Sequence, residues 1–192
     1  TLPFDLKPFQ VEVVNDLGPL YEGEYYLSMG VGKTACSTVT ALFHKLYYGT
    51  CCVVIMPPIL LKQWEVWLKS IKPALKVVKY AGTPTERAAM SLDADFVLVG
   101  VQIFKKEFDR FYEFYKDRQV TVIIDEANMV SNINTDNHEK LYSFCLGRHK
   151  LLLTGTPMNN PMDAYGLLKF VAPGIYRNKT QFLRIHTLSV DM

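Results

Sequence analysis

The chain has 192 residues, of which 49% are apolar and 21% charged, so it fits one globular domain with a full hydrophobic core and is not a disordered segment. The net charge of +2 gives no basic field over the whole surface, so any nucleic-acid contact must come from a local patch. No run approaches the ~18 apolar residues of a membrane span, and no secretory signal opens the sequence. The four cysteines show no metal-ligand spacing and are typical of a reducing compartment. We therefore expect an intracellular protein without a membrane partner, either cytoplasmic or, in a eukaryote, nuclear.

Strand-like and helix-like segments alternate along the chain. The predicted helices are 9–17, 35–46, 59–71 and 103–115. The predicted strands are 25–27, 51–56, 77–80, 96–101, 120–124 and 150–153. The polar stretch 131–137 is predicted to be a flexible loop. This alternation is typical of an α/β fold, a mainly parallel sheet with helices on both faces.

Two of the predicted helices have an apolar face. Leu61, Trp64 and Leu68 recur at helical spacing, and we assign them to the core rather than to stacking on DNA bases. Aromatic residues repeat every three to four positions in 103–115, while the charged residues between them form a solvated outer face.

A Met-Gly-Val-Gly-Lys-Thr segment lies between a predicted strand and a predicted helix. Gly30 and Gly32 allow a tight turn with no side chain over a phosphate, and the backbone N–H groups can then surround the anion. Lys33 is expected to reach the terminal phosphates, and the Thr34 hydroxyl to ligate magnesium. The strict pattern has a further glycine where this chain has Leu27, so a chance turn before a helix is the alternative.

A pair of acids follows a short β-branched strand directly. Ligands of open α/β sheets bind at the carboxyl ends of the strands, where Asp125 and Glu126 fall. Asp125 is expected to hold magnesium, mostly through water, and Glu126 to orient and deprotonate the attacking water. The alternative is a solvated loop that happens to be acidic.

The order and spacing of these segments resemble the first RecA-like lobe of superfamily-two helicases, and most closely that of the Swi/Snf-type DNA translocases. The segments that carry the resemblance are Leu-Lys-Pro-Phe-Gln at 6–10, the glycine-rich loop at 29–34, Pro-Pro-Ile-Leu-Leu-Lys-Gln-Trp at 57–64, Tyr-Ala-Gly at 80–82 followed by Arg87, and Leu-Leu-Leu-Thr-Gly-Thr-Pro-Met-Asn-Asn at 151–160. After the last segment the family has an acidic residue and a leucine-rich helix, here Asp163 and the stretch around Leu167. The resemblance covers about residues 6 to 182.

The resemblance implies that residues 1–192 are a RecA-like P-loop lobe that uses ATP and Mg²⁺ and works with a second such lobe absent from the chain. The catalytic candidates are Lys33, Asp125 and Glu126. The nucleotide-binding candidates are Gln10, Met29, Gly30, Val31, Gly32, Lys33, Thr34 and Thr156. The metal candidates are Thr34 and Asp125. The candidate contacts to double-stranded DNA, through its phosphates, are Lys62 and Arg87.

Several positions depart from the family pattern. Leu27-Ser28 replaces acidic residues, Asn128 replaces the usual histidine, and Gly100-Val101-Gln102 replaces a Thr-Tyr pair. These changes are compatible with the nucleotide chemistry, and they call into question the coupling of ATP to DNA and the details of the contact with DNA. The leading hypothesis is an ATP-dependent double-stranded DNA translocase or remodeller. A strand-separating DNA or RNA helicase and a non-catalytic nucleotide-binding module remain as alternatives.

Overall fold

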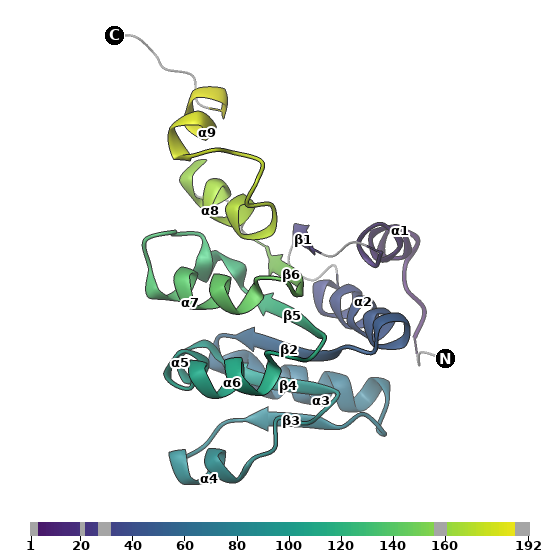
Figure 1. Cartoon of the computed structure of the whole chain (residues 1–192). Helices are drawn as coiled ribbons and strands as arrows, with labels where there is room; N and C mark the ends of the chain where they lie inside the picture. The colour runs from purple at the N-terminus through teal and green to yellow at the C-terminus, as the bar shows by residue number, and fades with distance from the viewer. Residues whose placement is uncertain (1–3, 20–21, 27–31, 156–160, 187–192) are drawn as a thin grey trace.

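The computed structural model describes residues 4–19, 22–26, 32–155 and 161–186 (Figure 1). Six strands of this part form one sheet in the order β1-β6-β5-β2-β4-β3, and each neighbouring pair is parallel. The strands are β1 (Glu22–Tyr26), β2 (Cys51–Met56), β3 (Val77–Tyr80), β4 (Phe96–Gly100), β5 (Val120–Asp125) and β6 (His149–Thr154). The α/β fold with a parallel sheet is confirmed.

Helices connect the strands and cover both faces of the sheet, as predicted. The α-helices are α1 (Pro8–Leu17), α2 (Lys33–Tyr48), α3 (Leu61–Ile71), α4 (Pro84–Ala89), α5 (Val101–Lys106), α6 (Phe108–Tyr115), α7 (Asp136–Cys145), α8 (Pro161–Val171) and α9 (Lys179–His186). Short 3-10 turns are η1 (Pro58–Leu60) and η2 (Ala127–Val130). In the part of the chain described, no helix combines the length and apolar character needed to cross a membrane.

The core consists of two apolar layers, one on each face of the sheet. Side chains of β2 alternate between them: Val53 and Ile55 join the layer under α5 to α8, whereas Val54 and Met56 join the layer under α1 to α3. Figure 1 shows α5, α6 and α7 in front of the sheet. Because both faces are covered, β2, β4 and β5 are almost fully buried, which explains their continuous apolar sequences.

The strand order places three functional segments beside one another. β6 lies between β1 and β5, with Tyr26 opposite Thr154 and Leu153 opposite Asp125. The glycine-rich segment follows β1, the acidic pair ends β5, and the Leu-Thr-Gly-Thr-Pro segment ends β6. All three therefore leave the same edge of the sheet at adjacent positions.

The predicted helix 103–115 is wrong as one continuous element. The helix starts at Val101, because β4 ends at Gly100, one residue earlier than the predicted strand. It breaks at Glu107 into α5 and α6. The Glu107 carboxylate accepts hydrogen bonds from Tyr80 and Arg87, so a tertiary network replaces helix continuity at this residue. The aromatic positions nevertheless lie as expected, because Phe111 and Tyr115 are fully buried.

Other boundaries differ by shorter stretches. The predicted helix at 59–71 begins as the 3-10 turn η1, and β1 starts before residue 25, while Leu27 lies outside the described residues. The predicted loop 131–137 is shorter than expected, because α7 begins at Asp136. Thr135 caps this helix by accepting a hydrogen bond from the His138 N–H at 3.3 Å.

Candidate nucleotide-binding site

The described end of the glycine-rich segment is the N-terminus of α2. Gly32 has a left-handed backbone, with φ at 95°, and α2 begins at Lys33. The half-buried Lys33 and Thr34 therefore lie in the first turn of a 16-residue helix, whose dipole and first-turn N–H groups favour an anion. The expected residues Met29, Gly30 and Val31 lie outside the described residues.

Gln10 of α1 lies against the glycine-rich segment, although the two are distant in sequence. A Cβ atom added at Gly32 would be 2.3 Å from Gln10 Nε2, so a side chain at position 32 would displace the end of Gln10, and the positive φ of 95° favours glycine there. Gln10 is 7% exposed, and its Oε1 accepts a hydrogen bond from the backbone N–H of Lys7 at 2.8 Å. The structure thus brings the candidate base-reading residue next to the candidate phosphate loop.

The acidic pair ends β5 near the middle of the sheet. Asp125 is 7% exposed, and both of its oxygens accept hydrogen bonds: Oδ1 from the Glu126 N–H at 3.0 Å and Oδ2 from Trp64 Nε1 at 2.7 Å. Glu126 has φ 55° and ψ 56°, and it is the one non-glycine residue with positive φ in the described chain. Such a backbone costs about 1–3 kcal/mol and is typical of functional sites.

The two motifs meet in one open cleft of about 860 Å³. It is lined by Gly32, Lys33, Thr34, Ala35, Leu60, Lys62, Gln63, Val66, Trp67, Ser70, Asp125 and Glu126. The Thr34 hydroxyl and the Asp125 carboxylate line this cleft and are hard oxygen donors, the ligand type that Mg²⁺ prefers, so the residues present fit the ion. The lysine and the helix N-terminus beside them suit a polyphosphate.

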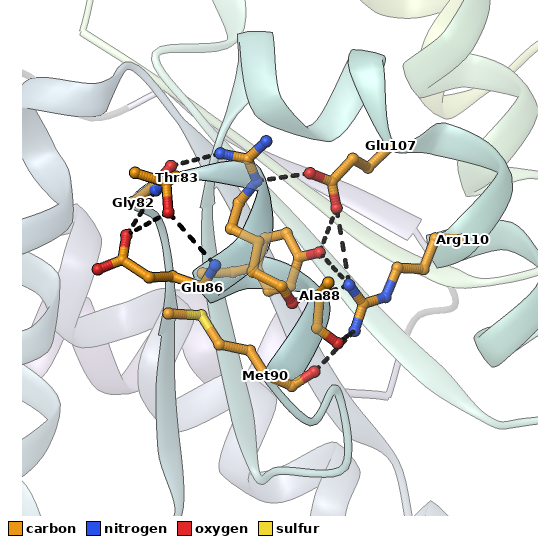
Figure 2. A network of polar contacts seen from close by, with 9 residues as sticks. Gly82, Thr83, Glu86, Ala88, Met90, Glu107 and Arg110 are labelled. Carbon is orange, nitrogen blue, oxygen red and sulfur yellow. Dashed lines mark hydrogen bonds and ion pairs between the residues drawn. The ribbon is translucent and has the colours of Figure 1, made fainter.

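The candidate DNA contacts fall in two different places. Lys62 is exposed on α3 and lines the cleft. Arg87 is buried, with 8% of its surface exposed, and its guanidinium donates to the Glu107 carboxylate and the Gly82 carbonyl (Figure 2). Burial within its own ion pair argues against a contact between Arg87 and a DNA phosphate.

The Arg87 contacts belong to a network between the β3–α4 segment and the break at Glu107 (Figure 2). The Tyr80 hydroxyl donates to Glu107 and accepts from Arg110, which also donates to the Met90 carbonyl at 2.7 Å. Burial and the hydrogen bond to Glu107 raise the pKa of Tyr80 to about 12. The network fixes the Tyr-Ala-Gly segment structurally.

Thr156 lies outside the described residues, but the elements on either side of its segment are placed. Helix α8 packs closely on the turn that follows the acidic pair, because a Cβ atom at Gly166 would lie 1.6 Å from the Ser131 carbonyl oxygen. The Ser131 hydroxyl also donates to the Asp163 carboxylate at 3.3 Å. The sequence did not predict this contact. A glycine at position 166, within the apolar stretch of α8, is the one feature that points to a close approach there.

Comparison with known proteins now gives the family. A family model described as the SNF2-related domain matches residues 28–190. The chain belongs to this family. The fold of this SNF2-related domain also resembles the "Sulfolobus solfataricus SWI2/SNF2 ATPase core in complex with dsDNA", with a TM-score of 0.78 and 22% identity over 95% of this chain and 39% of that one.

Curated relatives are much longer proteins. The chain is 30% identical to helicase SWR1 of Candida albicans and 30% identical to the chromatin-remodeling ATPase INO80 of Pyricularia oryzae. These alignments cover 88% and 92% of this chain but 11% and 10% of the relatives. The SNF2-related domain thus spans about a tenth of the length of these relatives.

Proposed function

We propose that this SNF2-related domain is the ATP-binding lobe of an ATP-dependent double-stranded DNA translocase or remodeller of the Swi/Snf type. The observation that carries the proposal is the cleft, in which Lys33 and Thr34 of α2 face the same space as Asp125 and Glu126 at the end of β5. A helix N-terminus with a lysine suits phosphates, and the two acids suit a metal and a water.

Each residue has a distinct role in ATP hydrolysis. Lys33 and the backbone N–H groups from Gly32 onward bind the phosphates, while Gln10 beside them recognises the base. Glu126 orients the attacking water and accepts its proton. The hydrogen bond from its backbone N–H fixes the main chain of Glu126 relative to Asp125.

Thr34 and Asp125 are the residues that would hold Mg²⁺. When bound, the ion supplies positive charge to the β- and γ-phosphates. The two oxygen ligands come from elements with fixed positions, the first turn of α2 and the end of β5. Few protein ligands suffice, because Mg²⁺ usually keeps several waters and takes further ligands from the phosphates.

DNA and a second RecA-like lobe are the proposed partners, and an intracellular location goes with them. Lys62 is the DNA-contact candidate that we retain, because it is exposed on α3. The solved archaeal core in complex with double-stranded DNA supports DNA as the partner, since this chain covers 39% of that core at the same fold. A second lobe would close the open side of the cleft.

Two alternatives can be separated from this proposal. A strand-separating helicase would release a labelled strand from a duplex, whereas a translocase would move along the duplex without releasing it. A non-catalytic module would bind ATP without DNA-stimulated hydrolysis. Asn128 is the residue that favours the non-catalytic alternative, because its amide cannot become cationic as the family's histidine can.

The test is the DNA-stimulated ATPase of the full-length protein and two variants. Lys33→Ala should lose nucleotide binding and turnover together, because Lys33 contacts phosphates. Glu126→Gln should retain binding of Mg-ATP and lose turnover by ~10²-fold or more, because it keeps the shape and removes the base. Normal hydrolysis by either variant would contradict its assigned role, and strand release by the wild type would favour the helicase.

A further inference from the structure

Helix α3 carries both tryptophans of the chain, and each indole donates a hydrogen bond toward a candidate magnesium ligand. Trp64 Nε1 donates to Asp125 Oδ2 at 2.7 Å. Trp67 Nε1 donates to Thr38 Oγ1 at 3.2 Å, and the Thr38 hydroxyl donates to the Thr34 carbonyl at 2.6 Å. One helix is therefore linked both to the end of β5 and to the first turn of α2.

The contact between Trp64 and Asp125 is buried and geometrically fixed. Trp64 is 1% exposed and packs in the apolar layer under α1 to α3, so its ring has little freedom to rotate. The other carboxylate oxygen is held by the Glu126 N–H. A carboxylate has about four lone-pair sites, so each oxygen keeps one site for a metal or a metal-bound water.

We propose that Trp64 and Trp67 are positioning residues for magnesium, which set the orientation of Asp125 and the position of Thr34 relative to it. The inference rests on the proposed function, in which these two residues hold the ion. Partners that orient metal ligands typically change metal affinity by about 10- to 100-fold when they are removed. Trp64 has the larger effect, because its partner is a buried carboxylate, whereas Trp67 is half-buried and donates to a neutral hydroxyl.

A role in core packing alone would give a different result. Trp64→Phe keeps an aromatic ring in the core and removes the N–H. If Trp64 served packing alone, this variant would lower stability and leave the dependence on magnesium unchanged. Tyr115→Phe is a matched control, because it removes a fully buried donor, to the Leu92 carbonyl at 2.8 Å, from the opposite apolar layer.

The first experiment measures binding of a fluorescent ATP analogue to the 192-residue chain over a series of Mg²⁺ concentrations. For Trp64→Phe, the Mg²⁺ concentration at half-maximal binding should rise by about 10-fold or more, with a smaller rise for Trp67→Phe. Binding in EDTA should equal that of the wild type for both, and Tyr115→Phe should give the wild-type curve. A Trp64→Phe curve that superimposes on the wild type would overturn the inference.

Asp125→Ala separates this inference from the function on which it rests. If Asp125→Ala leaves the magnesium curve unchanged, the proposed metal site is wrong, and the positioning role falls with it. If Asp125→Ala loses the magnesium dependence while the Trp64→Phe curve equals that of the wild type, the metal site stands and only the positioning role is wrong.

A second measurement needs no folded Trp64 variant. The chain has two indole N–H resonances in a ¹⁵N-labelled sample, and Trp67→Phe assigns them by leaving one. The Trp64 resonance should shift when Mg²⁺ and nucleotide are added together, and should stay in place when nucleotide is added with EDTA. A Trp64 resonance whose chemical shift does not change when Mg²⁺ is added with nucleotide would overturn the inference.

Discussion

Glu126 shows how a single residue can be held in an unfavourable conformation. Its left-handed backbone directs its N–H back to Asp125 Oδ1, while its carbonyl accepts a hydrogen bond from the Met129 N–H at 3.1 Å and so starts η2. The neighbours on both sides therefore over-determine the conformation. The main chain that carries this glutamate is thereby fixed without a ligand, which suits the proposed role of Glu126 as general base.

Lys62 is the residue on which the DNA prediction now rests. Lys62→Ala should weaken duplex binding by the full-length protein uniformly across base sequences, because a lysine–phosphate contact carries no sequence information. The plot of log affinity against log salt should become less steep by about 1. The measurement is fluorescence anisotropy over a salt series, with Lys69→Ala, an exposed lysine of α3 paired with Glu65, as the control. An unchanged slope for Lys62→Ala would remove it from the DNA surface.

At this scale the sequence identified residue types better than their surroundings. Asp125 and Glu126 follow a β-branched strand, and strand ends are where ligands bind, so their place was predictable. The ion pair of Arg87 was not predictable, because its partner Glu107 lies at a helix break that no local pattern signals. Trp64 was correctly placed in the core, but periodicity says nothing about the direction of an indole N–H.

Among the elements, α8 and the end of η2 approach each other closely beside the site. Gly166→Ala should lower the free energy of unfolding by about 1–3 kcal/mol or more, because the added methyl collides with the Ser131 carbonyl and must displace the helix. In an open helix the same change would stabilise the protein by up to ~1 kcal/mol. Urea unfolding is the measurement, and Gly174→Ala, where nothing lies within 4 Å of the added atom, is the control. Equal effects at the two positions would refute the close packing.

The junction between α2 and the sheet contains a buried histidine. Burial, and then the nearby His149, lower the pKa of His44 to about 4, while its ring nitrogens contact Gly18 and Thr121. Because this pKa is below the unfolded value of about 6.5, the unfolded state takes up the proton first as pH falls. Stability should therefore be lost between about pH 6.5 and 4, by up to about 3 kcal/mol from this group.

Unfolding free energies of the wild type and of His44→Gln, measured across this pH range, test the assignment. The variant should start less stable at pH 7 and show a shallower decline, with the remaining slope partly due to His138, whose pKa is also lowered by burial. Parallel curves for the two proteins would assign the acid sensitivity to other groups.

The alternation of strands and helices was readable because buried parallel strands have continuous apolar sequences with polar punctuation. The short helices could not be predicted in the same way. Helix α4 consists of six residues that start at a Thr83–Glu86 capping box, and α9 carries one buried side chain, Phe182. Such helices depend on caps and a few tertiary contacts rather than on a repeating pattern.

For the molecule as a whole, the open cleft predicts weak activity in isolation. The 192-residue chain alone should bind nucleotide weakly and show little ATPase, with little stimulation by duplex DNA, because none of the described residues closes the outer side of the cleft. Adding the second lobe, in cis or in trans, should raise the rate by orders of magnitude, since an arginine finger alone typically contributes ~10³–10⁵. Steady-state ATPase with and without DNA measures this, and robust DNA-stimulated turnover by the lone chain would contradict it.

The strand order also determines when the phosphate loop can form during synthesis. In the described sheet β1 pairs with β6, and Glu22 lies opposite Lys150. The strand that precedes the loop can therefore pair only after nearly the whole lobe has been synthesised. Closing so long a stretch of chain is entropically unfavourable until β2, β4 and β5 have assembled and offer β6 an edge. During synthesis we therefore expect β1 to lack its strand partner until β6 has been made, so that nucleotide binding at the proposed site would require a completed sheet.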